Sequence, residues 1–597
     1  MFVWTQDELN DKQGEIVLST ENILLVACPG SGKTRTLTYK IAYELDKLDD
    51  PRKYIIAITY TNKAAEEIKE RIELLGVNIS QLWIGTIHSF CNEWILKPYF
   101  NLIDDLQYGY RILDAYESEN ILNYFCSEIE TERITAWNCN HYATLDGIQA
   151  VEKRDSVLIV LKKYFNFLQE NHAINYEQIL DFSFSLLSKN EIISKTLANI
   201  FHYILVDEYQ DTKEIQYHII AKILKSAKGS VGSFIVGDPN QSIYGGLGGY
   251  PMKKTELEKI SNLDYQLHHL ENNYRSSKSI IEYFDYYKTY DNNIVPSGKN
   301  IDYDSLITLN TTVSVNDLVK KIVNLLKDTI HNQNIDPEEI CIVAPQWVHL
   351  ASITRNLIVE MPDYSFNGPG MAPFSRDIEN FWYKLSRIVL TEPSPKMYIR
   401  RLRWSKEVLK ELESIGVDIK KVSPKDLLKV CNSFTVEEKL GIQYLKEVFR
   451  LFCMELDIDL DIYTTLNRSY ATFFESSKKR IAKIIKVGNS SIETIESFKK
   501  VFKQREGITI STIHGVKGLE FDTVIAFGIL EGYVPHQNDK NGDDTAKKLL
   551  YVISSRAKKN LHIIAENGRK NFRKKPLKIT KIVEQYPYSY TKSDMDM

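Results

Sequence analysis

Residues 23–34 read Ile-Leu-Leu-Val-Ala-Cys-Pro-Gly-Ser-Gly-Lys-Thr, the most informative segment of the chain for its fold class. Its opening run of apolar residues is typical of a strand buried on both faces of a parallel sheet. A loop of small residues follows, and after Lys33 the apolar spacing becomes that of a helix. A strand, a Gly-Lys-Thr loop and a helix together predict a phosphate-binding loop (P-loop). In such a loop Lys33 reaches the nucleotide phosphates and Thr34 binds Mg²⁺.

A second buried strand supplies the carboxylates that a P-loop enzyme needs. Residues 203–206 are apolar and run directly into Asp207 and Glu208. Asp207 is expected to hold Mg²⁺, and Glu208 to act as the general base that polarises the attacking water. Two adjacent acids at a strand end are common by themselves, but beside a P-loop they indicate nucleotide hydrolysis.

The alternation of strands and helices predicts the α/β class with parallel sheets flanked by helices. Residues 55–58 and 234–236 are further buried strands near the P-loop, and strands at 340–344, 523–527 and 561–565 form a second group. Two α/β units are therefore expected. The intervening stretches, about 97–177 and 396–496, carry mainly helical patterns and are interpreted as insertions.

Composition limits the class of protein. At 597 residues the chain is expected to form three to five domains. It has no apolar run of about 20 residues, as a membrane-spanning helix requires, and no signal-peptide pattern at its start, so a cytoplasmic location is expected. Seven scattered cysteines without a CxxC pair predict free thiols, mostly buried.

The net charge of −4 gives no general sign of nucleic-acid binding. Two local basic stretches, Arg400–Lys410 and Arg569–Lys581, are candidates for phosphate-facing patches. A solvated helix or loop face is the alternative for each.

Eight further segments follow one another in the order of the signature motifs of one helicase family. They are Leu9–Gln13, Thr59–Ala65, Gly85–Phe90, Val206–Thr212, Val236–Tyr244, Leu270–Ser276, Thr512–Asp522 and Leu550–Ala557. On these motifs the chain resembles the UvrD/Rep/PcrA helicases of superfamily 1. They cover both α/β units, whereas the insertions carry almost none.

The resemblance implies two RecA-like domains that face each other across one ATP. The first comprises residues 1–96 and 178–268 with insertion 97–177. The second comprises residues 269–390 and 497–597 with insertion 391–496. It implies an ATP-dependent translocase or helicase that moves 3′→5′ on single-stranded DNA or on single-strand/duplex junctions, with ATP and Mg²⁺ as cofactors.

The resemblance also assigns roles to individual residues. Gln13 would read the adenine, Arg35 and Tyr274 would sandwich it, and Glu520 would contact the ribose. Gln241 would sense the γ-phosphate, with Arg275 and Arg556 as arginine fingers from the second domain. Gly30, Ser31, Gly32, Lys33 and Thr34 would wrap the phosphates. Tyr60 would stack on a base, and the remaining DNA contacts would be Thr61, Asn62, Thr86, His88 and His514.

The sequence departs from the family at Gly246 and Leu247, where an aromatic residue and an arginine are usual. One base-stacking platform is therefore missing, so we expect DNA-dependent ATP hydrolysis with weak unaided unwinding. Alternatives are a nucleic-acid-sensing motor subunit of a larger complex, such as a Gabija-type anti-phage system with a nuclease or other partner, and a binding protein with a degenerate ATP site. The intact ATPase residues argue against the latter. A fused nuclease is not expected from the roughly forty residues after the last motif.

Overall fold

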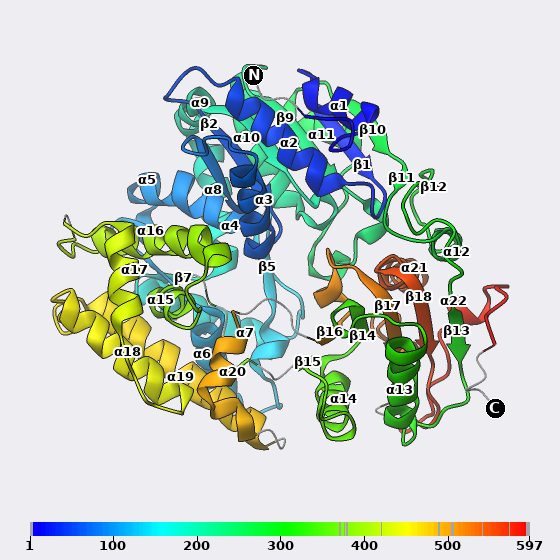
Figure 1. Ribbon diagram of the computed structural model, residues 1–597. Helices are drawn as coiled ribbons and strands as arrows, with labels where there is room; N and C mark the ends of the chain where they lie inside the picture. The colour runs from blue at the N-terminus through cyan, green and yellow to red at the C-terminus, as the bar shows by residue number, and fades with distance from the viewer. Residues whose placement is uncertain are drawn as a thin grey trace.

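The computed structural model describes residues 4–592 except 369–371, 375–376, 378–379, 420, 487–489, 503–506, 540 and 572. Two six-stranded parallel sheets dominate it, and two mainly helical bodies make up the rest (Figure 1). The fold class is therefore α/β with two RecA-like sheets, as predicted from the sequence. Within the described residues, no helix is long and apolar enough to cross a membrane.

The first sheet carries the P-loop and is buried on both faces. Alternate residues of β1 enter different cores: Leu25 packs with helices α1, α2 and α3, whereas Leu24 packs with the cluster that holds α8, α9, α10 and α11. This two-sided burial explains the continuous apolar runs of the sequence. In sheet order the strands are β10 (Gln266–Leu270), β1 (Ile23–Ala27), β9 (Gly232–Gly237), β8 (Phe201–Val206), β2 (Tyr54–Thr59) and β3 (Leu82–Thr86). The helices are α1 (Asp11–Leu18), α2 (Lys33–Asp46), α3 (Asn62–Leu74), α4 (Ile87–Phe90), α8 (Tyr176–Lys189), α9 (Glu191–Ile200), α10 (Glu214–Ala227) and α11 (Lys254–Ser261).

The second sheet repeats this design. One of its faces packs with α12 and α21, and the other with α13 and α14. Every strand pair is parallel, so the carboxyl ends of its strands share one edge. In sheet order the strands are β13 (Ile307–Asn310), β18 (Ala557–Ile564), β17 (Phe521–Phe527), β14 (Ile340–Ala344), β16 (Ile508–Thr512) and β15 (Phe366–Asn367). The helices are α12 (Lys278–Asp285), α13 (Leu318–Lys327), α14 (Trp347–Glu360), α21 (Gly542–Ser554) and α22 (Lys581–Glu584).

The first insertion contains α6 (Ala115–Ser127) and α7 (Asp155–Glu170) around their own small core. It also holds a β-hairpin that the sequence reading did not predict, β5 (His141–Thr144) and β6 (Gly147–Ala150). The Asp146-Gly147 pair is a turn signal for this hairpin, and Gly147 has a φ of 103°.

The second helical body packs around one aromatic-rich core that starts at Phe374, so it includes residues on both sides of the boundary predicted at residue 391. In Figure 1 it lies beside α3 and α5 (Lys97–Tyr99) of the first unit. Its helices are α15 (Phe381–Val389), α16 (Tyr398–Ser414), α17 (Pro424–Ser433), α18 (Gly441–Glu455), α19 (Thr464–Lys486) and α20 (Ile495–Lys500). All seven cysteines are free thiols, and six of them are buried, as predicted.

Candidate ATP cleft and nucleic-acid track

The P-loop between β1 and α2 is shaped by two glycines in the left-handed region. Gly30 has a φ of 71° and Gly32 a φ of 79°, values that side chains other than glycine rarely adopt. A Cβ added at Gly30 would lie 2.6 Å from Arg275 Cβ. The segment that carries Arg275 therefore packs directly on the loop, where the backbone N–H of Tyr274 donates to the Gly30 carbonyl at 3.0 Å.

Lys33 and the two predicted carboxylates meet at the end of this loop. Lys33 Nζ lies 3.3 Å from Asp207 Oδ1 and forms an ion pair with Glu208. Burial would raise the pKa of Glu208, but Lys33 and Lys517 outweigh it and lower that pKa to about 2. Burial raises the pKa of Asp207 despite the neighbouring Lys33. Glu208 also accepts from the Gln210 amide, so its carboxylate is held in one orientation.

The second α/β unit contributes basic side chains to the same cleft. Arg556 is buried, and its Nη2 donates to Gln241 Oε1 at 2.9 Å. Arg275 Nε donates to Glu520 Oε2 at 2.7 Å. Burial, reinforced by Arg275, lowers the pKa of Arg556 to about 9, which leaves it charged at neutral pH. Residues of both units thus line one cavity of about 680 Å³.

The side chains predicted to hold the base also line this cavity. Gln13 Nε2 donates to the Ser31 carbonyl at 2.9 Å, and Arg35 Nη1 donates to the Glu8 carbonyl at 3.1 Å. The Tyr274 hydroxyl accepts from Asn10 Nδ2 at 2.7 Å. Gln13, Arg35, Tyr274 and Glu520 all line the cavity, so the structure brings the predicted nucleotide residues together.

The donor set suits a nucleotide with one Mg²⁺. Ser31 Oγ is buried in the P-loop without a hydrogen-bond partner among the described residues, which fits a phosphate oxygen as its partner. Thr34 and Lys33 line the cavity; Asp207 does not, but its Oδ1 lies 3.3 Å from Lys33 Nζ. One hydroxyl and one carboxylate, completed by phosphate oxygens and water, are the ligands Mg²⁺ prefers. The described residues contain no group of three or more His, Cys, Asp or Glu placed to hold a metal without a nucleotide.

A row of three aromatic rings crosses from the first unit to the second. Tyr60, at the end of β2, is 40% exposed, and its ring centroid lies 4.9 Å from that of Tyr244. Tyr244 in turn lies 5.2 Å from the ring of His514, which follows β16. Sequence reasoning placed Tyr60 and His514 on a nucleic-acid path but missed Tyr244. Tyr244 is the last residue of the Val236–Tyr244 motif, and this position could have identified it.

The glycine run after Tyr244 leaves open space beside this row. A Cβ added at Gly245 or Gly246 would meet no described atom within 4 Å. The Leu247 side chain lies outside the described part of the chain. This fits the sequence prediction that one aromatic platform is missing.

Lys517 connects the aromatic row to the ATP cleft. Its Nζ donates to the Gln241 carbonyl at 2.6 Å, pairs with Asp211 and lies 5.4 Å from the Tyr244 ring centroid. Gln241 holds Arg556 through its side chain, as described above. Burial raises the pKa of Asp211 to about 7, even with Lys517 beside it. Sequence reasoning missed Lys517 and Asp211 as site residues.

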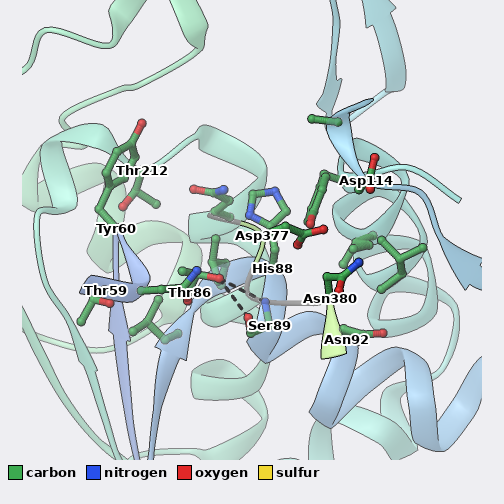
Figure 2. A pocket seen from close by; sticks show the side chains of 18 of the residues that line it. Thr59, Tyr60, Thr86, His88, Ser89, Asn92, Asp114, Thr212, Asp377 and Asn380 are labelled. Atoms are coloured by element: carbon green, nitrogen blue, oxygen red, sulfur yellow. Dashed lines mark hydrogen bonds between the residues drawn. The ribbon is translucent and has the colours of Figure 1, made fainter. Parts of the chain in front are cut away.

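A second cavity, of about 400 Å³, lies between the first sheet and the two helical bodies. Figure 2 shows Tyr60 and Thr86 on one side of it, His88 in the middle and Asp114 and Asn380 beyond. Asn62 also lines the cavity, whereas Thr61 does not; the Thr61 hydroxyl instead caps α3. Burial lowers the pKa of His88 to about 4, and its buried Nε2 has no hydrogen-bond partner among the described residues.

The basic stretch Arg400–Lys410 does not form the phosphate-facing patch considered from the sequence, because its first arginines are neutralised inside the protein. Arg400 Nη2 donates to Glu70 Oε2 at 2.8 Å, and Arg403 Nη2 donates to Glu70 Oε1 at 3.0 Å. Nearby, Arg387 Nη1 lies 3.0 Å from Glu66 Oε1. These ion pairs hold the second helical body against α3.

Replacing Glu70 by alanine is expected to loosen this contact, because Arg403 would be left buried without its closest carboxylate. Removing one partner of a buried pair costs about 3–5 kcal/mol, and the partial exposure of Glu70 puts the loss at or below the lower end. Thermal unfolding and hydrogen exchange of α16 would measure it. Glu67→Ala, on the same helix but in an exposed pair with Arg71, is the control and should change stability by no more than about 0.5 kcal/mol. Equal effects of the two substitutions would contradict the role given to Glu70.

The comparisons with known proteins agree with this geometry. Residues 9–252 match the UvrD/REP helicase N-terminal domain, and residues 460–568 match the UvrD-like helicase C-terminal domain. The ATP-dependent DNA helicase PcrA of Staphylococcus epidermidis is 26% identical over 92% of this chain and 82% of its own length. PcrA of Staphylococcus aureus is 33% identical over 46% of this chain and 39% of its own length.

Two RecA-like units line one nucleotide cleft, which is the arrangement of a P-loop ATPase of the two-domain helicase type. The chain belongs to the UvrD/Rep family of superfamily 1 helicases and is similar to PcrA. As a member of that family it is an ATP-dependent DNA helicase.

Proposed function

We propose that this chain couples ATP hydrolysis to 3′→5′ movement along single-stranded DNA, by closing and reopening the cleft between its two RecA-like units. Residues 1–96 with 178–268 and residues 269–390 with 497–597 are the two units. Residues 97–177 and 391–496 are the insertions, the second packing together with the segment just before it. A ligand that contacts both units favours the closed cleft, and its hydrolysis removes that preference.

The observation that carries this proposal is the connected set of contacts from the ATP cleft to the aromatic row. Arg556 contacts Gln241, Gln241 contacts Lys517, and Lys517 lies at the Tyr244 ring. Tyr244 touches Tyr60 on one side and His514 on the other. A change at the γ-phosphate can therefore alter how the two units hold a DNA strand, without a further connecting element.

At the cleft, Gly30, Ser31, Gly32 and Lys33 bind the phosphates, and Thr34 and Asp207 hold Mg²⁺. Glu208 is the general base. Lys33 pairs with Glu208 in this structure; a phosphate that takes Lys33 as its partner would free the Glu208 carboxylate to accept a proton from water. Arg275 and Arg556 stabilise the charge that develops on the transferred phosphoryl group. Gln13, Arg35, Tyr274 and Glu520 orient the nucleoside.

On the nucleic-acid side, the bases stack on Tyr60 and Tyr244, which requires no particular sequence. Asn62, Thr86, His88 and His514 contact the backbone or sugars, and Thr61 acts through the helix that it caps. His88 is neutral at pH 7 and would act as a hydrogen-bonding group without a charge.

Replacing Tyr60 by alanine is expected to weaken single-stranded DNA binding by about 1–3 kcal/mol, because one stacking surface is lost. Tyr60→Phe keeps the ring and is the matched control, with near-normal binding. Fluorescence titration with a labelled oligonucleotide measures both, and ATP hydrolysis without DNA should stay unchanged. If Tyr60→Ala bound the oligonucleotide as tightly as the wild type, Tyr60 would not be a DNA-stacking residue.

Duplexes that carry a 3′ or a 5′ single-stranded tail test both the direction of movement and the unwinding activity. The proposal predicts ATP-dependent movement only on the 3′-tailed substrate, with little strand separation by the chain alone, because the open space at Gly246 removes a platform. Efficient, processive unwinding by the purified chain, or activity on the 5′-tailed duplex only, would contradict it.

The same open space favours a second candidate function, a motor subunit whose partner protein completes the DNA contacts. An anti-phage complex with a nuclease and a DNA-repair complex are both compatible with this candidate, and we propose a cytoplasmic location for either. Copurification of the tagged chain from its host, followed by unwinding assays with and without the copurified partner, separates the subunit from a self-sufficient helicase.

A further inference from the structure

One segment of the first unit enters the second unit beside the ATP cleft. It follows β9 and comprises residues 239–243, and we call it the β9 extension. Ile243, at its end, is buried in an apolar core of the second unit together with residues of α12 and α21. Asn240, in its middle, has no exposed surface. The β9 extension therefore joins the two units through both an apolar and a polar side chain.

The side chain of Asn240 bonds to a loop of the second unit, residues 289–292. Its Nδ2 donates to the Tyr290 carbonyl at 3.0 Å and to Asn292 Oδ1 at 3.2 Å. Its Oδ1 accepts from the backbone N–H groups of Thr289 and Tyr290 at 2.8 and 2.7 Å. An asparagine amide has one NH₂ donor group and one carbonyl acceptor. Both ends of this side chain are therefore occupied by the other unit.

Each side of this contact is fixed to its own unit. In the first unit, Gln210 Oε1 accepts from the backbone N–H of Asp238 at 3.0 Å, and the Ser242 hydroxyl donates to the Gln210 carbonyl at 3.1 Å. In the second unit, Lys288, three residues beyond α12, donates from its Nζ to the Asn292 carbonyl at 2.8 Å. Asn240 thus connects two backbone segments that are each tied to the body of their own unit.

The chain itself crosses between the two sheets after β10. Within the described part of the chain, the strands of the first sheet all lie before residue 271 and those of the second sheet all lie after residue 306. At the crossing, Asn273 Nδ2 donates to the Pro29 carbonyl of the P-loop at 2.7 Å. A single crossing lets one body swivel about it in any direction. A second fixed point, at Asn240, leaves rotation about the line that joins the two points.

We propose that Asn240 is a positioning residue that forms the second anchor of the hinge between the two units. The hinge axis runs through Asn240 and the crossing at Asn273, and the ATP cleft opens and closes by rotation about it. The inference rests on the proposed function, because it says how the cleft movement is guided. Separating Asn240 from its loop would leave buried polar groups without partners, which is costly, so this contact persists in both states. The neighbouring Gln241 then meets Arg556 in the same place each time the cleft closes.

Replacing Asn240 by alanine should lower kcat at saturating ATP and single-stranded DNA by about 10–10²-fold, since a displacement of about 1 Å at a reacting group can cost that much. The affinity for ADP should change far less than kcat. Asn240→Asp keeps the acceptor oxygen for the two N–H groups and should recover part of the rate. The matched control is Asn560→Ala, because Asn560 is equally buried and its amide bonds to Leu306 and Gln333 within the second unit. This control should lower the unfolding temperature but leave kcat unaltered.

The hinge itself is measured by the distance between two spin labels, one on each unit. Lys225→Cys on α10 and Lys320→Cys on α13 are exposed labelling positions. The background carries Cys453→Ser, because the other six native cysteines are buried. With Asn240 intact, a non-hydrolysable ATP analogue and single-stranded DNA should shift one narrow distance distribution to another. Asn240→Ala should broaden both distributions, and Asn560→Ala should broaden neither.

If Asn240→Ala does not fold, Asn292→Ala removes one bond of the same anchor from the other side. It should broaden the distributions and lower kcat in the same direction, to a smaller extent. A folded anchor variant with unchanged kcat and unchanged distributions would overturn the inference, as would equal effects of Asn560→Ala. A distance distribution that neither the ATP analogue nor DNA alters in the protein with Asn240 intact would instead contradict the proposed function itself.

Discussion

Replacing Glu208 by glutamine is expected to lower kcat for ATP hydrolysis by about 10²–10⁴-fold, the range of a lost general base. The amide keeps the size of the side chain and can still contact Lys33 and Gln210, so the cleft should retain its shape. It cannot accept a proton from water. Nucleotide binding should therefore change far less than kcat.

For Glu208→Gln, steady-state hydrolysis at saturating single-stranded DNA measures kcat, and titration with a fluorescent ATP analogue measures nucleotide affinity. The matched control is Glu256→Gln, which changes a carboxylate at the start of α11 and should leave kcat unaltered. If kcat of Glu208→Gln fell by less than about tenfold, Glu208 would not be the general base, and another group would have to activate the water.

Replacing Arg556 by alanine is expected to lower kcat by about 10³–10⁵-fold, as for other arginine fingers. The guanidinium extends from the second unit into the cleft and donates to Gln241 of the first unit. Its loss removes a positive charge that stabilises the transition state and also a contact that joins the two units. Arg556→Lys keeps a charge without the planar fork and should recover only part of the rate. The effect on KM for ATP should be smaller than that on kcat.

The burial of Arg556 requires a check of folding, which thermal unfolding of each variant provides. Arg52→Ala, at an arginine that is 87% exposed, is the control for loss of a guanidinium and should hydrolyse ATP normally. If folded Arg556→Ala retained kcat within tenfold of wild type, Arg556 would be a structural residue and Arg275 would be the only finger of the pair.

The central strands were predictable because burial on both faces leaves a continuous apolar run, as in β1, β2 and β14. Edge strands were not. β10 reads Gln-Leu-His-His-Leu and is half exposed, so it lacks both an apolar run and a regular alternation. The β5–β6 hairpin was missed because its strands are short and their side chains mostly half-buried.

The ATP residues were predictable because each lies in a motif whose spacing the nucleotide fixes. The link through Lys517, Asp211 and Gln241 was not, since Lys517 lies 306 residues from Asp211 and 276 from Gln241 in the sequence, and the link exists only once the two units pack together. The two basic stretches show the same limit. Both are rich in Lys and Arg, but only the fold brings Glu70 to Arg400 and Arg403 of one stretch and leaves the lysines of the other in solvent.

The rate of ATP hydrolysis by the wild-type chain, measured with and without single-stranded DNA, shows whether the ATP cleft and the aromatic row are coupled. The contacts from Arg556 to Tyr60 predict a large stimulation by DNA that is much reduced in Tyr60→Ala at subsaturating strand. A rate that no nucleic acid changes would contradict the proposed function, because the ATP cleft and the aromatic row would then be uncoupled.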